Sequence, residues 1–367
     1  MPHSQSYLGQ PKEAIDTPAL LVDLDLFEAN IQRIASYCQT HLTQWRPHSK
    51  AHKSPAIAHL LLQAGAWGIT CAKVSEAAVM VQHGVDNILI ANQLATPTKL
   101  ARIAALQHKA KVLSTLDTLE LVDLTAAAAQ AEGTIIPVLI DIDIGMNRTG
   151  IPPGQPCLEL AEKIISTPGL SLEGIMGYEG HVLDISPPAA KETACHKALD
   201  HLLHCRDLLE KAGIPVSIIS AGGTGCYQLT AAYSGITEIQ AGGGIFMDAL
   251  YRDTCHIDDL QPALTVLATV TSRHQDHIVT DAGFKTMSSY HQAPVPLHRP
   301  ELSLNYLSAE HGVLDIAKGH QGPAVGEQVE FLVGYSDSTN VLHDRFLGLR
   351  QGQVEIVWDI LGRGQLT

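Results

Sequence analysis

Eight short runs of strand-forming residues alternate with helical patterns in the first two thirds of this 367-residue chain. Strands that alternate with helices form right-handed βαβ units and a parallel sheet. Eight such units in about 200 residues predict a closed (β/α)8 barrel of the TIM type, with an open doubly wound sheet as the alternative. The runs are TQWRPHSK (43–50), WGITCA (67–72), NILIAN (87–92), AKVLST (110–115), IIPVLIDID (135–143), LEGIMGYEG (172–180), VSIISAGG (216–223) and EIQAGG (238–243).

The alternation of strand and helix patterns ends after residue 245. The runs ALTVLATVTSR, HIVTDAG, EQVEFLVG and RFLGLRQGQVEIVWDI read as strands separated by turns, and helical patterning is nearly absent. This pattern predicts a second, mostly antiparallel β domain. The segment ALLVDL at 19–24 precedes the barrel and is suited to pair with that sheet. We therefore expect a barrel domain over 25–245 and a β domain made of 1–24 plus 246–367.

Composition narrows the class of partner. A formal net charge of −14 argues against nucleic acid, because phosphate backbones bind basic surfaces. The chain has no run of about 18 apolar residues, so no membrane span is expected, and its first residues lack the apolar core of a signal peptide. Seven cysteines are scattered singly, which is typical of a reduced, cytoplasmic protein. A small molecule is the expected partner.

Two glycine clusters follow the last two predicted strands of the barrel. They are Gly222 to Gly225, which includes Thr224, and Gly242 to Gly244. Active sites of such barrels lie at the C-terminal strand ends, and the last two loops often bind phosphate. Glycine lets backbone N–H groups close on an anion, and a threonine hydroxyl adds a donor. The clusters predict a phosphate site, with simple tight turns as the alternative. Neither cluster is a dinucleotide fingerprint or a Walker loop.

The stretch RPHSKAHK, from Arg46 to Lys53, crowds positive charge at the end of the first predicted strand. A lysine there, combined with a phosphate site, indicates an imine with a phosphorylated aldehyde cofactor. Neighbouring cations would lower the pKa of the reactive amine by charge repulsion. Alternation places Arg46 and Lys50 on one face if the strand continues to Lys50, whereas Lys53 would point to solvent before the helix that begins at Ser54-Pro55. A solvated basic loop is the alternative.

These residues carry a family resemblance. The segments DTPALLVDLDLFEANI and RPHSKAHKSP resemble the fold-type III pyridoxal phosphate enzymes of the D-threonine aldolase and D-serine dehydratase group, which have an alanine racemase-like barrel. The resemblance covers nearly the whole chain in order. It continues through GITCAKVSEA, DIDIGMNRTGI, GYEGH, SAGGTGCY, EIQAGGGIFMD, DAGFKTMS, AEHG and LHDRF.

The resemblance implies a role for particular residues around pyridoxal 5′-phosphate. Lys50 matches the lysine that binds the cofactor covalently, Arg148 the arginine at its phenolate oxygen, and Tyr178 the residue beside its ring. For proton transfer at the substrate hydroxyl, His311 in AEHG is preferred because the β domain caps the site in the family, with His181 and His52 as alternatives. Family members form homodimers. The groups implied to hold the phosphate are Thr224, Gly225, Gly242 and Gly243.

The resemblance also implies a lyase that acts on D-3-hydroxy amino acids. Retro-aldol cleavage to glycine and an aldehyde, as in D-threonine aldolase, is the preferred reaction. The alternatives are dehydration of D-serine or 3-hydroxy-D-aspartate, racemisation of an amino acid, and a non-catalytic pyridoxal phosphate carrier.

Two departures from the family pattern concern the phosphate site and a metal. The chain has Gly242-Gly243-Gly244 where relatives often have glycine, serine and tyrosine. Many relatives also bind a divalent metal through a histidine and, two residues later, a cysteine or aspartate. Here GYSDSTNVLHD places Tyr335 and Asp337 at those positions. Neutral tyrosine is a poor ligand, so Asp337 would bind Mn, Mg or Zn only with help from His311 or water, and the alternative is that no metal binds.

Overall fold

The computed structural model describes residues 7–367 and divides them into two compact units. The barrel unit comprises residues 34–50, 57–242 and 364–367. The sheet unit comprises the described chain up to Arg33, residues 51–56 and residues 243–363. Within the described part of the chain, no helix has the length and apolar character needed to cross a membrane.

The barrel unit contains eight parallel strands in the order β2-β9-β8-β7-β6-β5-β4-β3. A parallel bridge between His48 and Thr70 joins the two ends of this order, and the Thr70 N–H donates to the Pro47 carbonyl at 2.9 Å. The predicted parallel eight-stranded sheet is therefore confirmed. The strands are β2 (Gln44–Trp45), β3 (Ile69–Cys71), β4 (Asn87–Gln93), β5 (Lys111–Leu116), β6 (Ile136–Asp141), β7 (Leu170–Met176), β8 (Ile218–Ala221) and β9 (Glu238–Ile239).

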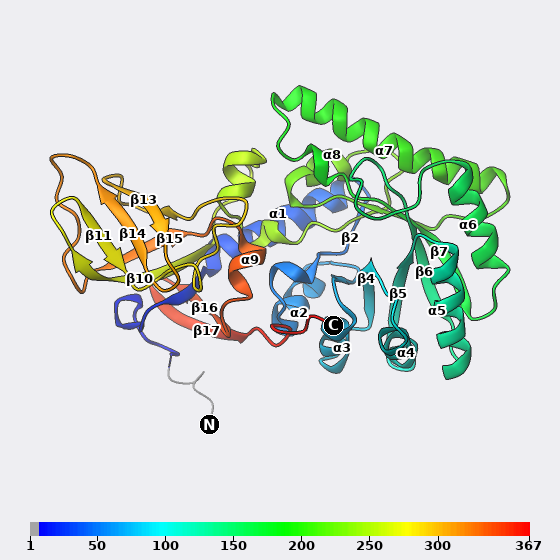
Figure 1. The fold of residues 1–367 in the computed structure, drawn as a ribbon, viewed down its shortest axis with the longest axis horizontal. Coiled ribbons are helices and arrows are strands. Elements are labelled where there is room, and N and C mark those ends of the chain that lie inside the picture. The colour runs from blue at the N-terminus through cyan, green and yellow to red at the C-terminus, as the bar shows by residue number, and fades with distance from the viewer. Residues whose placement is uncertain (1–6) are drawn as a thin grey trace. The chain divides into compact units, whose positions relative to one another are not determined.

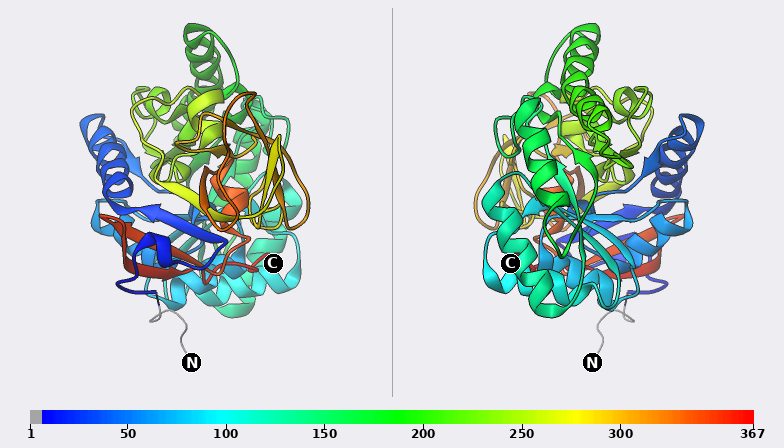
Figure 2. Two further views of the ribbon diagram at one scale, coloured as in Figure 1. Left: turned by 90° about the vertical axis from the view of Figure 1, so that its left-hand side faces the viewer. Right: turned by 90° about the vertical axis from the view of Figure 1, so that its right-hand side faces the viewer.

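Helices connect successive strands and lie outside the sheet, as Figure 1 shows for α4, α5 and α6 beside β4 to β7 and as the right-hand view of Figure 2 shows again. Proline occupies an opening position of several of them, where its missing N–H costs nothing. One apolar cluster takes a residue from each of five neighbouring strands: Leu89, Leu113, Leu139, Met176 and Ile218. The helices are α1 (Leu24–Thr40), α2 (Pro55–Gln63), α3 (Val74–Gln82), α4 (Pro97–Leu106), α5 (Leu119–Glu132), α6 (Gln155–Ile165), α7 (Pro188–Lys211) and α8 (Tyr227–Ala231).

The sheet unit is mostly antiparallel, as the sequence predicts. Its main strand order is β13-β14-β11-β10-β1-β16-β17, and β15 pairs with β10 and β12. The early strand β1 pairs antiparallel with β10 and parallel with β16, so a segment before the barrel belongs to the same sheet as the end of the chain. The short helix α9 (Ser336–Asn340) interrupts the strands. The strands are β1 (Ala19–Asp23), β10 (Leu264–Arg273), β11 (His277–Thr280), β12 (Val295–Pro296), β13 (Leu302–Leu307), β14 (Gly312–Ile316), β15 (Gln328–Leu332), β16 (Arg345–Arg350) and β17 (Gln353–Asp359).

The first predicted strand is shorter than expected. Regular β structure ends at Trp45, and Ser49–Ala51 forms a single 3-10 turn. Two features explain the early end: Pro47 has no N–H to donate, and the Ser49 hydroxyl donates to the Thr70 carbonyl at 2.9 Å. The strand does not continue to Lys50, so the prediction that Arg46 and Lys50 share a strand face is wrong.

Candidate active site

Lys50 lies on the turn that follows β2, at the C-terminal end of the barrel strands. The neighbouring Ser49 is fully buried, and its hydroxyl lies 2.6 Å from Oε1 of Glu76. The Lys50 N–H donates to Nδ1 of His48 at 3.2 Å. The backbone of Lys50 is thus fixed, while its side chain keeps partial exposure. A fixed backbone with an accessible amine suits a lysine that must meet a ligand atom.

Arg148 and Tyr178 lie together, as expected for two residues of one site. The guanidinium carbon of Arg148 is 5.6 Å from the centre of the Tyr178 ring, which is within cation–π range. Arg148 is exposed on the loop after β6. Asp143 holds that loop, because its Oδ1 accepts the N–H groups of Gly145 and Asn147, each at 3.0 Å. The carboxylate of Asp143 therefore fixes the shape of the segment that presents Arg148.

His181 lies against the same loop. A Cβ placed on Gly145 would come within 2.7 Å of Nε2 of His181, so the imidazole packs directly on this glycine. At the base of the loop, Oδ2 of Asp141 accepts hydrogen bonds from Gln93 at 2.8 Å and from Thr149 at 2.9 Å. Burial raises the pKa of the Asp141 carboxyl. His181 is exposed.

The two glycine clusters pack against the residues just described. A Cβ on Gly223 would lie 3.1 Å from the Tyr178 ring, so the loop after β8 passes directly beside that ring. A Cβ on Gly242 would lie 2.3 Å from the carbonyl oxygen of His48, which only glycine avoids. The loops after β8 and β9 thus contact Tyr178 and the turn that carries Lys50.

Some implied phosphate ligands fall in each unit. Thr224 and Gly225 are buried in the 3-10 turn after Gly223, within the barrel unit. Gly243 belongs to the sheet unit, where a Cβ would come within 2.6 Å of the Tyr251 ring. The absence of a side chain at Gly243 is explained by this contact with Tyr251, so the role of Gly243 in binding phosphate stays a prediction.

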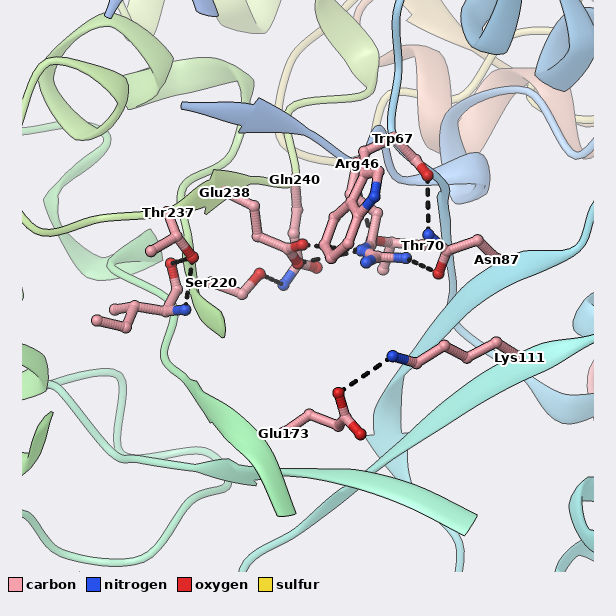
Figure 3. Close-up of polar contacts among 11 residues, drawn as sticks. Arg46, Trp67, Thr70, Asn87, Lys111, Glu173, Ser220, Thr237, Glu238 and Gln240 are labelled. Carbon is pink, nitrogen blue, oxygen red and sulfur yellow. Dashed lines mark hydrogen bonds and ion pairs between the residues drawn. The ribbon is translucent and has the colours of Figure 1, made fainter. Parts of the chain in front are cut away.

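The Arg46 side chain is directed away from the strand ends that carry Lys50. Figure 3 shows its side chain between Glu238, Asn87 and Trp67. Its Nε lies 3.0 and 3.1 Å from the two carboxylate oxygens of Glu238, and a terminal nitrogen donates to Asn87 at 2.8 Å. Glu238 and Asn87 are the first residues of β9 and β4, so the guanidinium points to the N-terminal end of the strands. Arg46 is fully buried, and Glu238 neutralises its charge inside the barrel.

His52 and Lys53 are both buried, within the sheet unit. Lys53 is only 6% exposed, so the prediction that it points to solvent is wrong. Nδ1 of His52 accepts the Ser54 N–H at 3.0 Å, and burial lowers the pKa of His52 to about 3. The imidazole therefore stays neutral at ordinary pH, and the part of His52 in proton transfer stays a prediction.

The three remaining predicted residues lie in the sheet unit. His311 is exposed at the turn between β13 and β14. The Tyr335 hydroxyl donates to Oδ2 of Asp337 at 2.6 Å, so this carboxylate is engaged by a phenol. Asp248 is fully buried, and burial, with help from the charge of Asp337, raises its pKa to about 7. Within residues 7–367, no three His, Cys, Asp or Glu side chains are grouped closely enough to hold a metal ion.

Two buried glutamates of the barrel unit were not singled out from the sequence. Glu76 on α3 receives the Ser49 hydroxyl and the Ala72 N–H, the latter at 3.0 Å. Glu179 follows Tyr178 directly and accepts hydrogen bonds from the loop after β8. Both have zero exposure. For Glu179, the available signal was its position just after the strand β7, because a buried carboxylate requires hydrogen-bond partners.

Comparison with known proteins settles the family. The model of the alanine racemase N-terminal domain matches residues 22–249, and a model described as a serine dehydratase domain matches residues 263–349. The chain belongs to the alanine racemase-like family. This is a family of pyridoxal phosphate enzymes, so the resemblance stated from the sequence is confirmed.

Several similar proteins of this family are lyases. A D-threonine aldolase from Arthrobacter sp is 34% identical over 359 residues, covering 97% of this chain and 95% of the relative. A 3-hydroxy-D-aspartate aldolase from Paracoccus denitrificans (strain Pd 1222) is 31% identical, covering 97% of this chain and 94% of the relative. The crystal structure of D-threonine aldolase from Filomicrobium marinum matches with a TM-score of 0.95 and 34% identity, covering 98% of this chain and 99% of that one. The prediction of a lyase of this alanine racemase-like family is confirmed.

Proposed function

We propose that this chain cleaves D-3-hydroxy amino acids between Cα and Cβ, as a D-threonine aldolase does, releasing glycine and an aldehyde. The observation that carries the proposal is the gathering of Lys50, the Arg148–Tyr178 pair and the glycine loops at the C-terminal end of one barrel. Barrel enzymes place their chemistry at this end. The aldolase names of two relatives that cover nearly the whole chain support the choice of reaction.

The residues at this end of the barrel fit pyridoxal 5′-phosphate. Gly223 and Gly242 let the backbone pass close to Tyr178 and to His48, where a Cβ would be crowded, and glycine-rich loops of this kind can bring backbone N–H groups close to a phosphate. Lys50 would hold the cofactor through its amine, which condenses with an aldehyde with loss of water, and the exposed Arg148 would supply positive charge for the phenolate oxygen. When bound, the cofactor supplies an electron sink for the charge left at Cα.

The cleavage also requires a group that takes the proton of the substrate's 3-hydroxyl. His311 remains the predicted residue, and His181 is the candidate within the barrel unit because it packs on the Arg148 loop. Replacing each by glutamine separates them: the variant that loses turnover more steeply, with unchanged cofactor binding, identifies the base. Turnover equal to that of the wild type in both variants would show that neither histidine takes this proton.

The donor set at Tyr335 and Asp337 does not fit a divalent metal. A neutral phenol is a weak ligand, and here it already donates to the carboxylate that would bind the cation. We therefore derive no step through a metal. By family resemblance we also propose a homodimer in solution, which light scattering on the purified protein would test.

Product analysis tests the proposed reaction directly. The purified holoenzyme would be incubated with D-threonine, D-serine and 3-hydroxy-D-aspartate, with and without EDTA, beside a Lys50→Ala control. We expect D-threonine to yield glycine and acetaldehyde in equal amounts, with no product from Lys50→Ala. An oxo acid with ammonia would indicate a dehydratase, and L-amino acid would indicate a racemase. Unchanged substrate beside a retained cofactor band would indicate a carrier, and each of these results would overturn the aldolase proposal.

A further inference from the structure

A buried lysine lies behind the loop that follows β8. Lys191, in the first turns of α7, is only 6% exposed, and its Nζ donates to the carbonyl oxygen of Gly225 at 2.6 Å. Lysine is almost never fully buried unless a partner compensates its charge. Its sequence spacing explains the burial, because Lys191, Cys195, Ala198 and Leu202 recur on one face of α7 and all are buried.

The buried carboxylate of Glu179 binds the same loop on both sides of Gly225. Oε2 of Glu179 accepts the Gly222 N–H at 3.1 Å, and Oε1 accepts the Cys226 thiol at 3.0 Å and the Thr230 hydroxyl. Hydrogen bonding with Cys195, followed by burial and the Glu179 charge, raises the pKa of Cys226, so the thiol stays protonated and able to donate. Glu179 thus holds the first N–H of the loop away from any ligand.

The charges of Lys191 and Glu179 act on this loop in opposite ways. Gly223 passes beside the Tyr178 ring, and Lys191 binds the carbonyl of Gly225 two residues later. A carbonyl that is held by a cation points away from the ligand side, which favours N–H groups facing an anion. The ammonium also offsets the negative charge of Glu179, which would otherwise repel a phosphate through a medium of low dielectric.

We propose that Lys191 is a positioning residue for the cofactor's phosphate: it acts through the Gly225 carbonyl and by its buried charge, and it contributes to affinity only when the ligand carries that phosphate. This inference rests on the proposed cofactor. Lys191 lies on α7, outside the sequence segments that carry the family resemblance. Pyridoxal, which has the aldehyde but lacks the phosphate, separates Lys191 from Lys50, since Lys50 needs only the aldehyde.

The test compares dissociation constants of the full-length apoenzyme for pyridoxal phosphate and for pyridoxal, read from the visible absorption of the bound aldehyde. In Lys191→Met we expect the constant for pyridoxal phosphate to rise at least about tenfold, and the constant for pyridoxal to change less than about threefold. Competition by inorganic phosphate should weaken in parallel. Lys197→Met removes a charge from the exposed face of the same helix and should change neither constant.

Lys191→Gln keeps a donor but removes the charge, and it provides the same ratio if the methionine variant does not fold. Equal weakening of both ligands, in either variant, would show that Lys191 only supports the loop and would overturn the proposal, as would no change at all. A wild-type protein that gives no visible band with either aldehyde would overturn the proposed function itself, which is a different result from an unchanged ratio.

Discussion

Arg46 and Glu238 form a buried ion pair inside the barrel. The two side chains are 0% and 1% exposed, and Arg46 also bonds Asn87 and lies 4.6 Å from the centre of the Trp67 ring. Removing one partner of such a pair leaves an uncompensated buried charge, which costs about 3–5 kcal/mol of unfolding free energy. We therefore expect Glu238→Gln and Arg46→Met each to lower the free energy of unfolding by about that amount.

Urea unfolding followed by far-UV circular dichroism measures this loss, and the double variant Arg46→Met/Glu238→Leu should lose clearly less than the two single variants together. The exposed pair Lys111–Glu173, also drawn in Figure 3, is the matched control. There Lys111→Met should cost at most about 1 kcal/mol. A loss below about 1 kcal/mol in both barrel variants, or a changed pH dependence of cofactor binding without loss of stability, would refute the structural role of Arg46.

Two further predictions concern the sheet unit. The folded-state pKa of Asp248 is raised from 3.8 to about 7, so the folded protein holds this proton more tightly than the unfolded chain does. The stability that the protonated carboxyl contributes therefore declines as pH rises from about 4 to about 7. In Asp248→Asn the slope of unfolding free energy against pH should be flatter in this window, and an identical slope would contradict the assignment. Tyr335→His would pair an imidazole with Asp337 in place of the phenol, so added Mn²⁺ should raise the melting temperature of this variant and leave the wild type unchanged; an equal rise in both proteins would show that the native Tyr335–Asp337 pair already binds the cation.

The architecture was predictable because hydrophobic periodicity reports local structure directly. Each of the eight barrel runs overlaps an observed strand, and Pro55 marks the start of α2 as expected. Strands β13 and β14 were missed, because their exposed residues break the apolar alternation that marks a half-buried strand. The turn at Lys50 was read as strand for a related reason: pairing in this segment is set by Pro47 and by a serine hydroxyl rather than by alternation.

Side-chain burial was less predictable than chain path. The sequence placed Arg46 on a strand face shared with Lys50 and pointed Lys53 toward solvent, yet both residues are buried. Glu238, which is 192 residues away, decides the orientation of Arg46. A single sequence does not reveal such pairings, since a charge and its partner carry no shared local pattern. Arg148 and Tyr178 could be expected to lie together, as they do, because each belongs to a local motif that the sequence shows.

The identity of the lysine that binds the cofactor is the central claim, and one measurement addresses it. The holoenzyme is reduced with sodium borohydride, which makes the lysine–cofactor bond permanent, and the digested peptides are mapped by mass spectrometry. We predict that the cofactor is found on Lys50, which is fixed on its turn with a partly exposed side chain. Attachment at Lys53, or no attachment to any lysine of the chain, would contradict the account.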